Sequence, residues 1–101
     1  MTRLVVTPEA DADAIDILAY LHREAGPRIA ENYSHRFQDA LDRLAELPES
    51  GAPRPTLGPN TRIAIVLPYL LIYDYAPDDD TLILLRILHG RRNITRMLLG
   101  R

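Results

Sequence analysis

The feature that most constrains the fold is a set of three apolar segments in the second half of the chain, separated only by short turns. They cover residues 62–67, 69–75 and 81–88. The last two are joined by the sequence Ala-Pro-Asp-Asp-Asp, which is ordinary hairpin chemistry. Apolar segments of this length and spacing predict an antiparallel meander of three strands.

The first half of the chain predicts a short strand and then a helix. Residues 3–7 are strand-like, and the pair Thr7-Pro8 follows directly. Thr7 can cap a helix and Pro8 suits its first position, while acidic residues in the first turn complement the helix dipole. Apolar residues then recur at helical spacing until Gly26, which is a natural stop.

A second helix is expected from Pro27 through about Leu47. Its apolar stripe includes Tyr33 and Phe37, which we expect in the core. Because the connection between the helices is so short, they should form an antiparallel hairpin. The order β-α-α-β-β-β therefore predicts an α+β fold, a two-layer sandwich with the hairpin on one face of the meander, in a single domain over residues 1–101.

The predicted strands are apolar on both faces. By strict alternation, Leu82, Leu84 and Leu88 lie on one face of the last strand, and Leu70 and Ile72 lie on one face of the middle strand. Two helices can cover only one side of the sheet, and a strand that is apolar on both faces normally needs both covered. We therefore expect a partner chain or self-association to cover the second face. The alternative is that the loop over residues 48–60 and the C-terminal tail cover it.

The composition excludes several kinds of chemistry. The chain has no cysteine, so disulfides and thiol catalysis are excluded, and its three scattered histidines are a poor zinc set. All twelve basic residues are arginine, so no amine is available whose pKa could be lowered for base chemistry. No apolar stretch approaches the roughly 20 residues of a membrane span, and no secretory signal is evident. We expect a cytoplasmic protein without metal or cofactor.

Positive charge is concentrated at the C-terminal end. The net charge is −2, yet no carboxylate follows Asp80 and residues 86–101 contain five arginines. The whole molecule is therefore not a general binder of polyanions, and we expect no sequence-specific binding of DNA. Its C-terminal end is a candidate local surface for an anion or an acidic partner.

The chain resembles the RelE/ParE superfamily of bacterial toxin–antitoxin toxins, and the resemblance covers essentially its whole length. The matching features are the opening over residues 4–10, Pro48 and Gly51 after the second helix, Arg62, the tract Tyr-Leu-Leu-Ile-Tyr over residues 69–73, and the tract Arg-Ile-Leu-His-Gly-Arg-Arg-Asn over residues 86–93. The last tract is similar to the Arg-x-Leu-His-x-x-Arg-Asp ending of ParE-type and plasmid-stabilisation proteins. Asn93 stands where the family often has aspartate.

This resemblance implies a small toxin that is encoded beside a ParD-like antitoxin and neutralised by it in a hetero-oligomeric complex. Such an antitoxin typically lays a helix and an extended segment across the toxin. That arrangement fits the apolar face left uncovered by the helices, since helices in grooves and added strands are the available binding modes. We accordingly assign antitoxin binding to Leu70, Ile72, Leu82 and Leu84.

The superfamily divides by target, and ParE-like members resemble inhibitors of DNA gyrase. Inhibition of this kind requires only a binding surface. We assign target binding to the residues at the tip of the last strand and in the tail, namely Arg86, His89, Arg91, Arg92 and Arg96.

RelE-like members instead cleave messenger RNA in the ribosome. Such cleavage needs a general acid and base, together with cations for the charge that develops on phosphorus. Here those groups would be Arg62, Arg86, His89 and Arg91. RelE-like catalytic sets also rely on lysines and often on a C-terminal tyrosine, whereas this chain has no lysine and its last tyrosine is Tyr75. We therefore favour the gyrase-directed reading, in which no catalytic residue is expected.

The residues of the strand tip also have structural interpretations, which remain open at this point. Arg86 could pair with Asp74 across the last hairpin, and His89 could cap the strand. Arg91 and Arg92 could meet an acidic segment of the antitoxin rather than the target.

Overall fold

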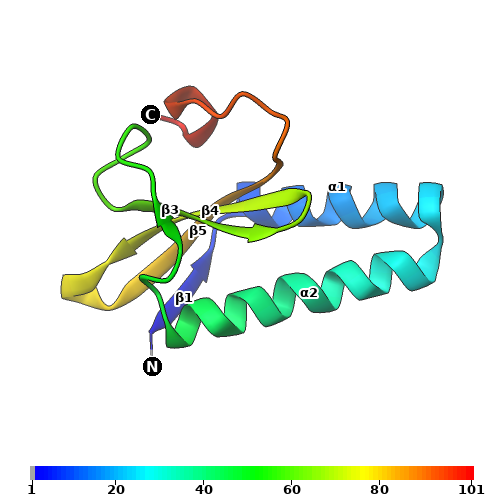
Figure 1. Ribbon diagram of the computed structural model, residues 1–101, viewed down its shortest axis with the longest axis horizontal. Helices are drawn as coiled ribbons and strands as arrows, with labels where there is room; N and C mark the ends of the chain where they lie inside the picture. Colours follow the sequence, from blue (N-terminus) through cyan, green and yellow to red (C-terminus); the bar gives the residue numbers. More distant parts are fainter. Residues whose placement is uncertain (1) are drawn as a thin grey trace.

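The computed structural model describes residues 2–101, which form a five-stranded sheet with two helices (Figure 1). The elements in chain order are β1 (Arg3–Val6), α1 (Pro8–Ala25), α2 (Pro27–Glu46), β2 (Ala52–Pro53), β3 (Thr61–Val66), β4 (Tyr69–Ala76), β5 (Thr81–His89) and two short 3₁₀ turns, η1 (Pro77–Asp79) and η2 (Arg96–Leu99). The predicted α+β order is confirmed. The addition is β2, which lies inside the predicted loop. Over residues 2–101, neither helix combines the length and the apolar character needed to cross a membrane.

The sheet is mixed because its first strand joins it in parallel. The strand order is β1-β5-β4-β3-β2, with β1 parallel to β5 and every other pair antiparallel. Since β1 pairs with β5 only as far as Leu84, the end of β5 has no strand on its β1 side within residues 2–101. This unpaired stretch of β5 lies beside the start of α1 (Figure 1).

Both helices begin and end where their local sequence predicts. The hydroxyl of Thr7 accepts a hydrogen bond from the backbone N–H of Ala10 at 3.1 Å and donates one to the carbonyl of Leu85 at 2.9 Å. The cap of α1 therefore also ties the helix to β5. Gly26, at φ 92°, ends α1 in a conformation that favours glycine, and α2 starts at the next residue.

The main core lies between the helices and the sheet. Phe37 is 5% exposed, and its ring centroid lies 5.7 Å from that of Tyr69 and 6.3 Å from that of Tyr33. Leu71 and Tyr73 of β4 are fully buried in the same cluster. The predicted core position of Phe37 is confirmed, and Tyr33 packs at the edge of the cluster, partly buried.

A β-bulge in β5 changes which of its residues face the helices. The pairing between β4 and β5 shifts by one residue, so the ladder skips Leu85. Before the bulge, Leu82 and Leu84 pack in the core beneath the helices, and after it Ile87 does so. Leu88 lies in the cluster on the opposite face. The prediction that Leu82, Leu84 and Leu88 share a face is therefore wrong, because strict alternation fails at the bulge.

The correction extends to the expected antitoxin surface. Leu82 and Leu84 are 0% and 1% exposed under the helices, whereas Leu70 and Ile72 pack on the other face. The four residues thus do not form one surface, and the chain itself buries three of them.

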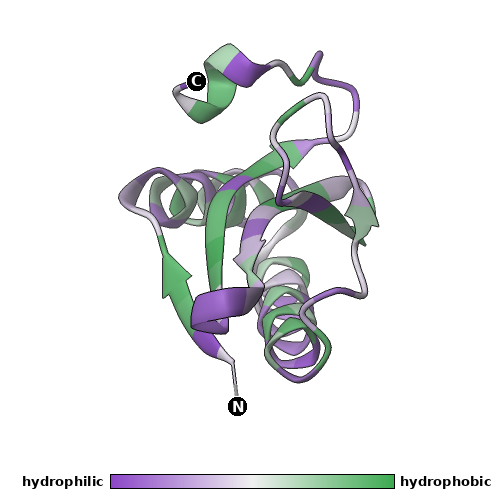
Figure 2. Ribbon diagram, turned by 90° about the vertical axis from the view of Figure 1, so that its left-hand side faces the viewer, coloured by the Kyte–Doolittle hydropathy of each residue, from purple (hydrophilic) through white to green (hydrophobic). Residues whose placement is uncertain are grey.

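The second face of the sheet is covered by the chain itself. Its cluster combines strand residues with one loop residue and three tail residues, namely Leu57, Ile94, Leu98 and Leu99. Figure 2 shows the C-terminal segment on one side of the sheet and α2 on the other. The expectation that a partner must cover this face is wrong, and the alternative of coverage by the loop and tail is confirmed.

We expect Phe37→Ala to lower the free energy of unfolding by about 3 kcal/mol or more, because it empties a well-packed aromatic site. Ile15→Ala, at a residue of α1 that is 61% exposed, is the matched control and should change stability by less than about 0.5 kcal/mol. Urea denaturation of the three proteins measures both values. A loss below about 1 kcal/mol for Phe37→Ala would contradict this description of the core.

Candidate functional site

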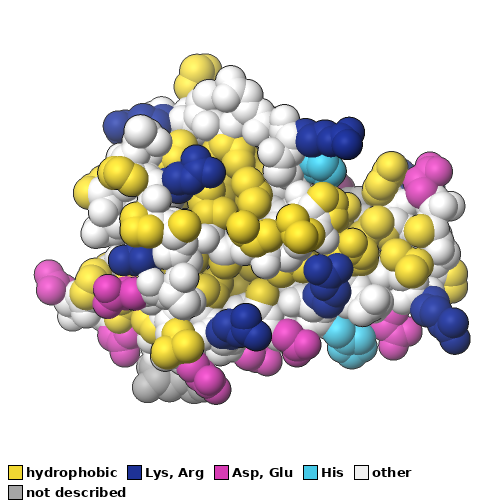
Figure 3. All heavy atoms as spheres, in the orientation of Figure 1, with side chains coloured by type: hydrophobic (Ala, Val, Ile, Leu, Met, Phe, Trp, Pro, Cys, Tyr) yellow, Lys and Arg dark blue, Asp and Glu magenta, His cyan; other side chains and the backbone are white. Residues whose placement is uncertain are grey.

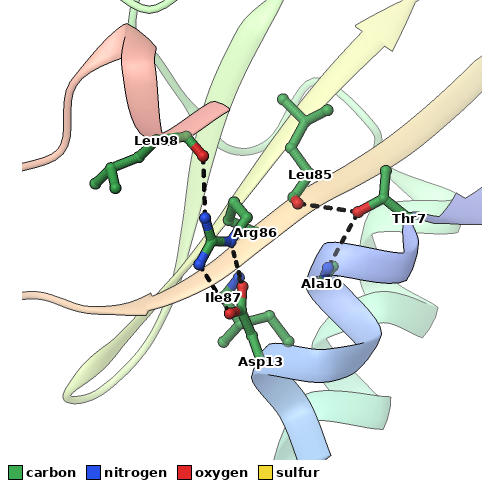
Figure 4. A network of polar contacts seen from close by, with 7 residues as sticks. All are labelled: Thr7, Ala10, Asp13, Leu85, Arg86, Ile87 and Leu98. Carbon is green, nitrogen blue, oxygen red and sulfur yellow. Dashed lines mark hydrogen bonds and ion pairs between the residues drawn. The ribbon is translucent and has the colours of Figure 1, made fainter. Parts of the chain in front are cut away.

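Arg86 lies on the stretch of β5 that β1 leaves unpaired, where α1 supplies a carboxylate instead of a strand. The guanidinium Nε and Nη2 donate to the two carboxylate oxygens of Asp13 at 2.7 and 3.0 Å. The same carboxylate accepts the backbone N–H of Ile87 at 2.9 Å (Figure 4). Asp13 therefore takes the place of a neighbouring strand and forms a bidentate pair, the strongest geometry for these two groups.

Arg86 also holds the C-terminal tail. Its Nη1 donates to the carbonyl of Leu98 at 3.0 Å, on the opposite side from Asp13 (Figure 4). The side chains of Arg86 and Asp13 are only 20% and 15% exposed, and the hydrogen bonds that Arg86 donates to the Asp13 carboxylate raise the pKa of Arg86. The guanidinium is therefore a connector within the fold rather than a free cation at the strand tip.

The structural interpretation of Arg86 is thus confirmed, but with a different partner from the one expected. Asp74 is instead bound by the side chain of Arg101 at the end of the tail. Arg101 also donates to the carbonyl of Leu57 at 2.9 Å and to the hydroxyl of Thr61 at 2.8 Å. Two arginines, one on β5 and one at the C-terminus, therefore fix the tail over the second face of the sheet.

Arg62 serves a different part of the fold. Its Nη1 donates to the carbonyls of Glu49 and Gly51, both at 2.8 Å, and so holds the segment after α2 against β3. β3 and β5 are separated by β4, and the arginines bind at opposite edges of the sheet. Arg62 and Arg86 consequently do not converge on one phosphate-sized site, as the ribonuclease set requires.

His89 ends β5 and caps it. Its Nδ1 accepts the backbone N–H of Arg91 at 3.0 Å. The imidazole meets the ring of Tyr69 edge-on, with 5.8 Å between centroids and 82° between planes. The capping role that the sequence left open for His89 is confirmed.

Three arginines beyond β5 remain available at the surface. Arg91, Arg92 and Arg96 are exposed, and within residues 2–101 none of them forms an ion pair. We call these three residues the basic segment. The neighbouring Met97 is 84% exposed, so an apolar side chain accompanies the charges.

The turn between β3 and β4 lies next to the basic segment. The backbone N–H of Gly90 donates to the carbonyl of Pro68 at 2.8 Å, which places this turn beside the residue preceding Arg91. Leu67 and Ile65, at the end of β3, are 71% and 63% exposed. One end of the sheet therefore presents large apolar side chains together with arginines, a combination typical of protein-binding surfaces.

Sequence reasoning missed Asp13, although the chain contains a signal for it. Asp13 occupies the same helical stripe as Ala10 and Ile17, which face the sheet. A carboxylate in that position requires a hydrogen-bonding partner inside the fold. No local sequence pattern indicates the structural role of Arg101, because its partners come from distant parts of the chain. Among the residues that the structure describes, no cluster of His, Asp or Glu is suited to hold a metal ion.

We expect Asp13→Asn to destabilise the fold by about 2 kcal/mol, since it leaves a partly buried guanidinium without its charged partner. Asp16→Asn, at an exposed position of the same helix, provides the control and should cost less than about 0.5 kcal/mol. Thermal unfolding followed by circular dichroism compares the variants. Equal midpoints for the two would show that the pair contributes nothing specific.

Comparisons with known proteins agree with this architecture. A family model described as the ParE toxin of the type II toxin–antitoxin system parDE matches residues 4–94. Among solved structures, the chromosomal ParDE toxin–antitoxin system from P. aeruginosa matches with a TM-score of 0.74 and 23% identity, covering 88% of this chain and 96% of that one. The RelBE2 toxin–antitoxin complex from Mycobacterium tuberculosis matches with a TM-score of 0.61 and 24% identity, covering 87% and 96%. No curated protein matches the sequence. At these identities the structural likeness establishes the fold alone.

Proposed function

The chain belongs to the ParE toxin family of type II toxin–antitoxin systems, and on this basis we propose that it arrests growth by binding DNA gyrase. The proposal includes a cytoplasmic site of action and neutralisation by a cognate, ParD-like antitoxin in a hetero-oligomeric complex. The solved relatives are themselves toxin–antitoxin systems, which supports a partner of that kind.

The observation that carries the gyrase proposal is the separation of the candidate catalytic arginines from one another. Arg62 is bound to the carbonyls of Glu49 and Gly51, and Arg86 is bound to Asp13. Neither guanidinium is free to stabilise charge on a phosphate. Ribonuclease chemistry would therefore rest on His89 and exposed arginines alone, whereas inhibition by binding needs only a surface.

The proposed target-binding surface is the basic segment together with His89. Arg91, Arg92 and Arg96 are exposed, and arginines are among the residues that contribute most to protein interfaces. Arg86 was expected to belong to the same surface. In this proposal it acts indirectly instead, because its bond to Leu98 helps to hold the tail that carries Arg96.

The test is inhibition of purified gyrase acting on plasmid DNA, with charge reversal in the basic segment. The triple variant R91E/R92E/R96E should raise the concentration of toxin needed for half-inhibition by about tenfold or more, because the loss of each cationic contact weakens binding. The control R3E/R23E/R28E makes the same change in charge at exposed positions away from this surface. It should inhibit like the wild type.

Expression of the chain alone should stop bacterial growth, and co-expression of the adjoining reading frame should restore it. If the wild-type chain is harmless on its own and no small partner frame adjoins it, a working toxin is excluded. If both triple variants inhibit gyrase as well as the wild type does, the basic segment is not the target-binding surface.

A further inference from the structure

The turn that follows β5 is held by three backbone hydrogen bonds. The N–H of Gly90 donates to the carbonyl of Pro68 at 2.8 Å, and the N–H of Arg92 donates to the carbonyl of His89 at 3.0 Å. The N–H of Arg91 donates instead to a side chain, the imidazole Nδ1 of His89, at 3.0 Å. The imidazole therefore fixes the backbone at the first arginine of the basic segment.

The imidazole is itself fixed by the core. It meets the ring of Tyr69 edge-on, and that ring packs in turn against Phe37 with 5.7 Å between centroids. The residue after His89 is a glycine that lets the turn lie close to the start of β4, because a Cβ at Gly90 would lie 3.2 Å from the carbonyl oxygen of Pro68. The position of the turn is thus set by the aromatic core, through His89.

The bond between His89 and the turn exists only while the imidazole is neutral. A ring nitrogen accepts a hydrogen bond only when it carries no proton, and both nitrogens of an imidazolium ion are donors. Imidazole is the side chain that ordinarily changes its charge between about pH 5 and pH 8. Protonation of His89 therefore breaks the bond to Arg91 and sets a positive charge beside the basic segment.

The charged side chains that surround His89 are arginines. β4 contributes Tyr69, and burial raises the pKa of its hydroxyl, which stays neutral over this range. α2 contributes Tyr33 and Arg36, which both donate hydrogen bonds to the turn between β3 and β4. The tail contributes the basic segment. Within residues 2–101, no carboxylate lies within ion-pair distance of His89, so none holds the protonated ring in place.

Two of the three arginines of the basic segment, Arg91 and Arg92, lie in this turn. Neither forms an ion pair within residues 2–101, so the backbone of the turn decides where their guanidinium groups can reach. Figure 3 shows arginine side chains beside a band of hydrophobic side chains on one face of the molecule. A partner that meets charged and apolar groups together binds more tightly when those groups are already held in place.

From these observations we infer that His89 is a positioning residue for target binding, and that its Nδ1 makes this binding depend on pH. The neutral imidazole holds the turn, so Arg91 and Arg92 are presented in one arrangement. The protonated imidazole releases the turn, which must then be ordered again when the target binds. Affinity therefore falls as pH falls. This inference rests on the proposed function, because it takes the target to be gyrase.

A direct contact between His89 and the target would have the opposite sign. If the imidazole touched an acidic surface, its protonation would add a favourable charge pair, and affinity would rise as pH falls. The direction of the pH dependence therefore separates a residue that holds the turn from one that touches the target.

Substitutions at position 89 separate the two nitrogens of the ring. H89N places an amide oxygen at the δ position, where Nδ1 lies, and can still accept from Arg91. H89Q carries the same amide at the ε position, in line with Nε2. H89F keeps a ring against Tyr69 but has no acceptor. The control is H22N, at an exposed histidine in the last turn of α1.

Equilibrium binding of each protein to purified gyrase is measured at about pH 5.5 and about pH 8. At the higher pH, H89F and H89Q should bind about fivefold more weakly than the wild type, and H89N more tightly than either of them. On acidification, the wild type and H22N should lose about threefold more affinity than H89N, whose amide does not titrate. The comparison between proteins removes the pH dependence of gyrase itself.

The free chain provides a second readout that does not involve gyrase. The amide NMR signal of Arg91 should shift on acidification in the wild type and in H22N, but not in H89N. Thermal unfolding midpoints close to that of the wild type would show that the variants are folded.

The contradicting results are distinguishable. If H89Q binds better than H89N, or if acidification strengthens binding of the wild type relative to H89N, the ring touches the target and only the inference falls. If the position-89 variants bind as the wild type does, the turn needs no positioning and again only the inference falls. If the wild type binds gyrase at neither pH although the Arg91 signal titrates, the proposed function fails and the inference about binding falls with it.

Discussion

The ion pair between Asp13 and Arg86 links parts of the fold that are distant in sequence. One carboxylate at the start of α1 satisfies a guanidinium and a backbone N–H of β5, at the point where β1 no longer flanks that strand. The same guanidinium reaches the carbonyl of Leu98. A single pair therefore joins the helical layer, the sheet and the tail. Because partly buried charges require their partners, the arrangement fixes the tail as well as the helix.

The local parts of this fold could be predicted from the sequence. Thr7 and Pro8 begin α1, and Gly26 separates the helices, since each acts through its own backbone or cap. The apolar stripe of α2 likewise placed Phe37 in the core. These features depend on residues within a few positions of one another, so a short stretch of sequence is enough to predict them.

The features that the sequence predicts wrongly are the faces of β5 and the cover of the second face of the sheet. Both depend on contacts between residues that are distant in the chain. Alternation predicts the faces of a strand only while its register is regular, and the bulge at Leu85 breaks that regularity. Leu84 consequently faces the helices rather than the tail. The cover of the second face also came from residues far away in sequence, among them Leu57 and Leu99. At the candidate site, the exposed arginines could be predicted from the charge pattern. The ion pair of Arg86 with Asp13 could not, because the two residues are 73 positions apart in the chain.

We propose that the chain acts by binding gyrase rather than by cutting RNA. The most direct measurement is equilibrium binding of the purified chain to purified gyrase in the absence of RNA and ribosomes. We predict saturable binding that weakens as salt is raised, because the exposed arginines contribute to it. The contradicting result is no binding to gyrase, together with codon-specific cuts in a translating extract that His89→Ala abolishes.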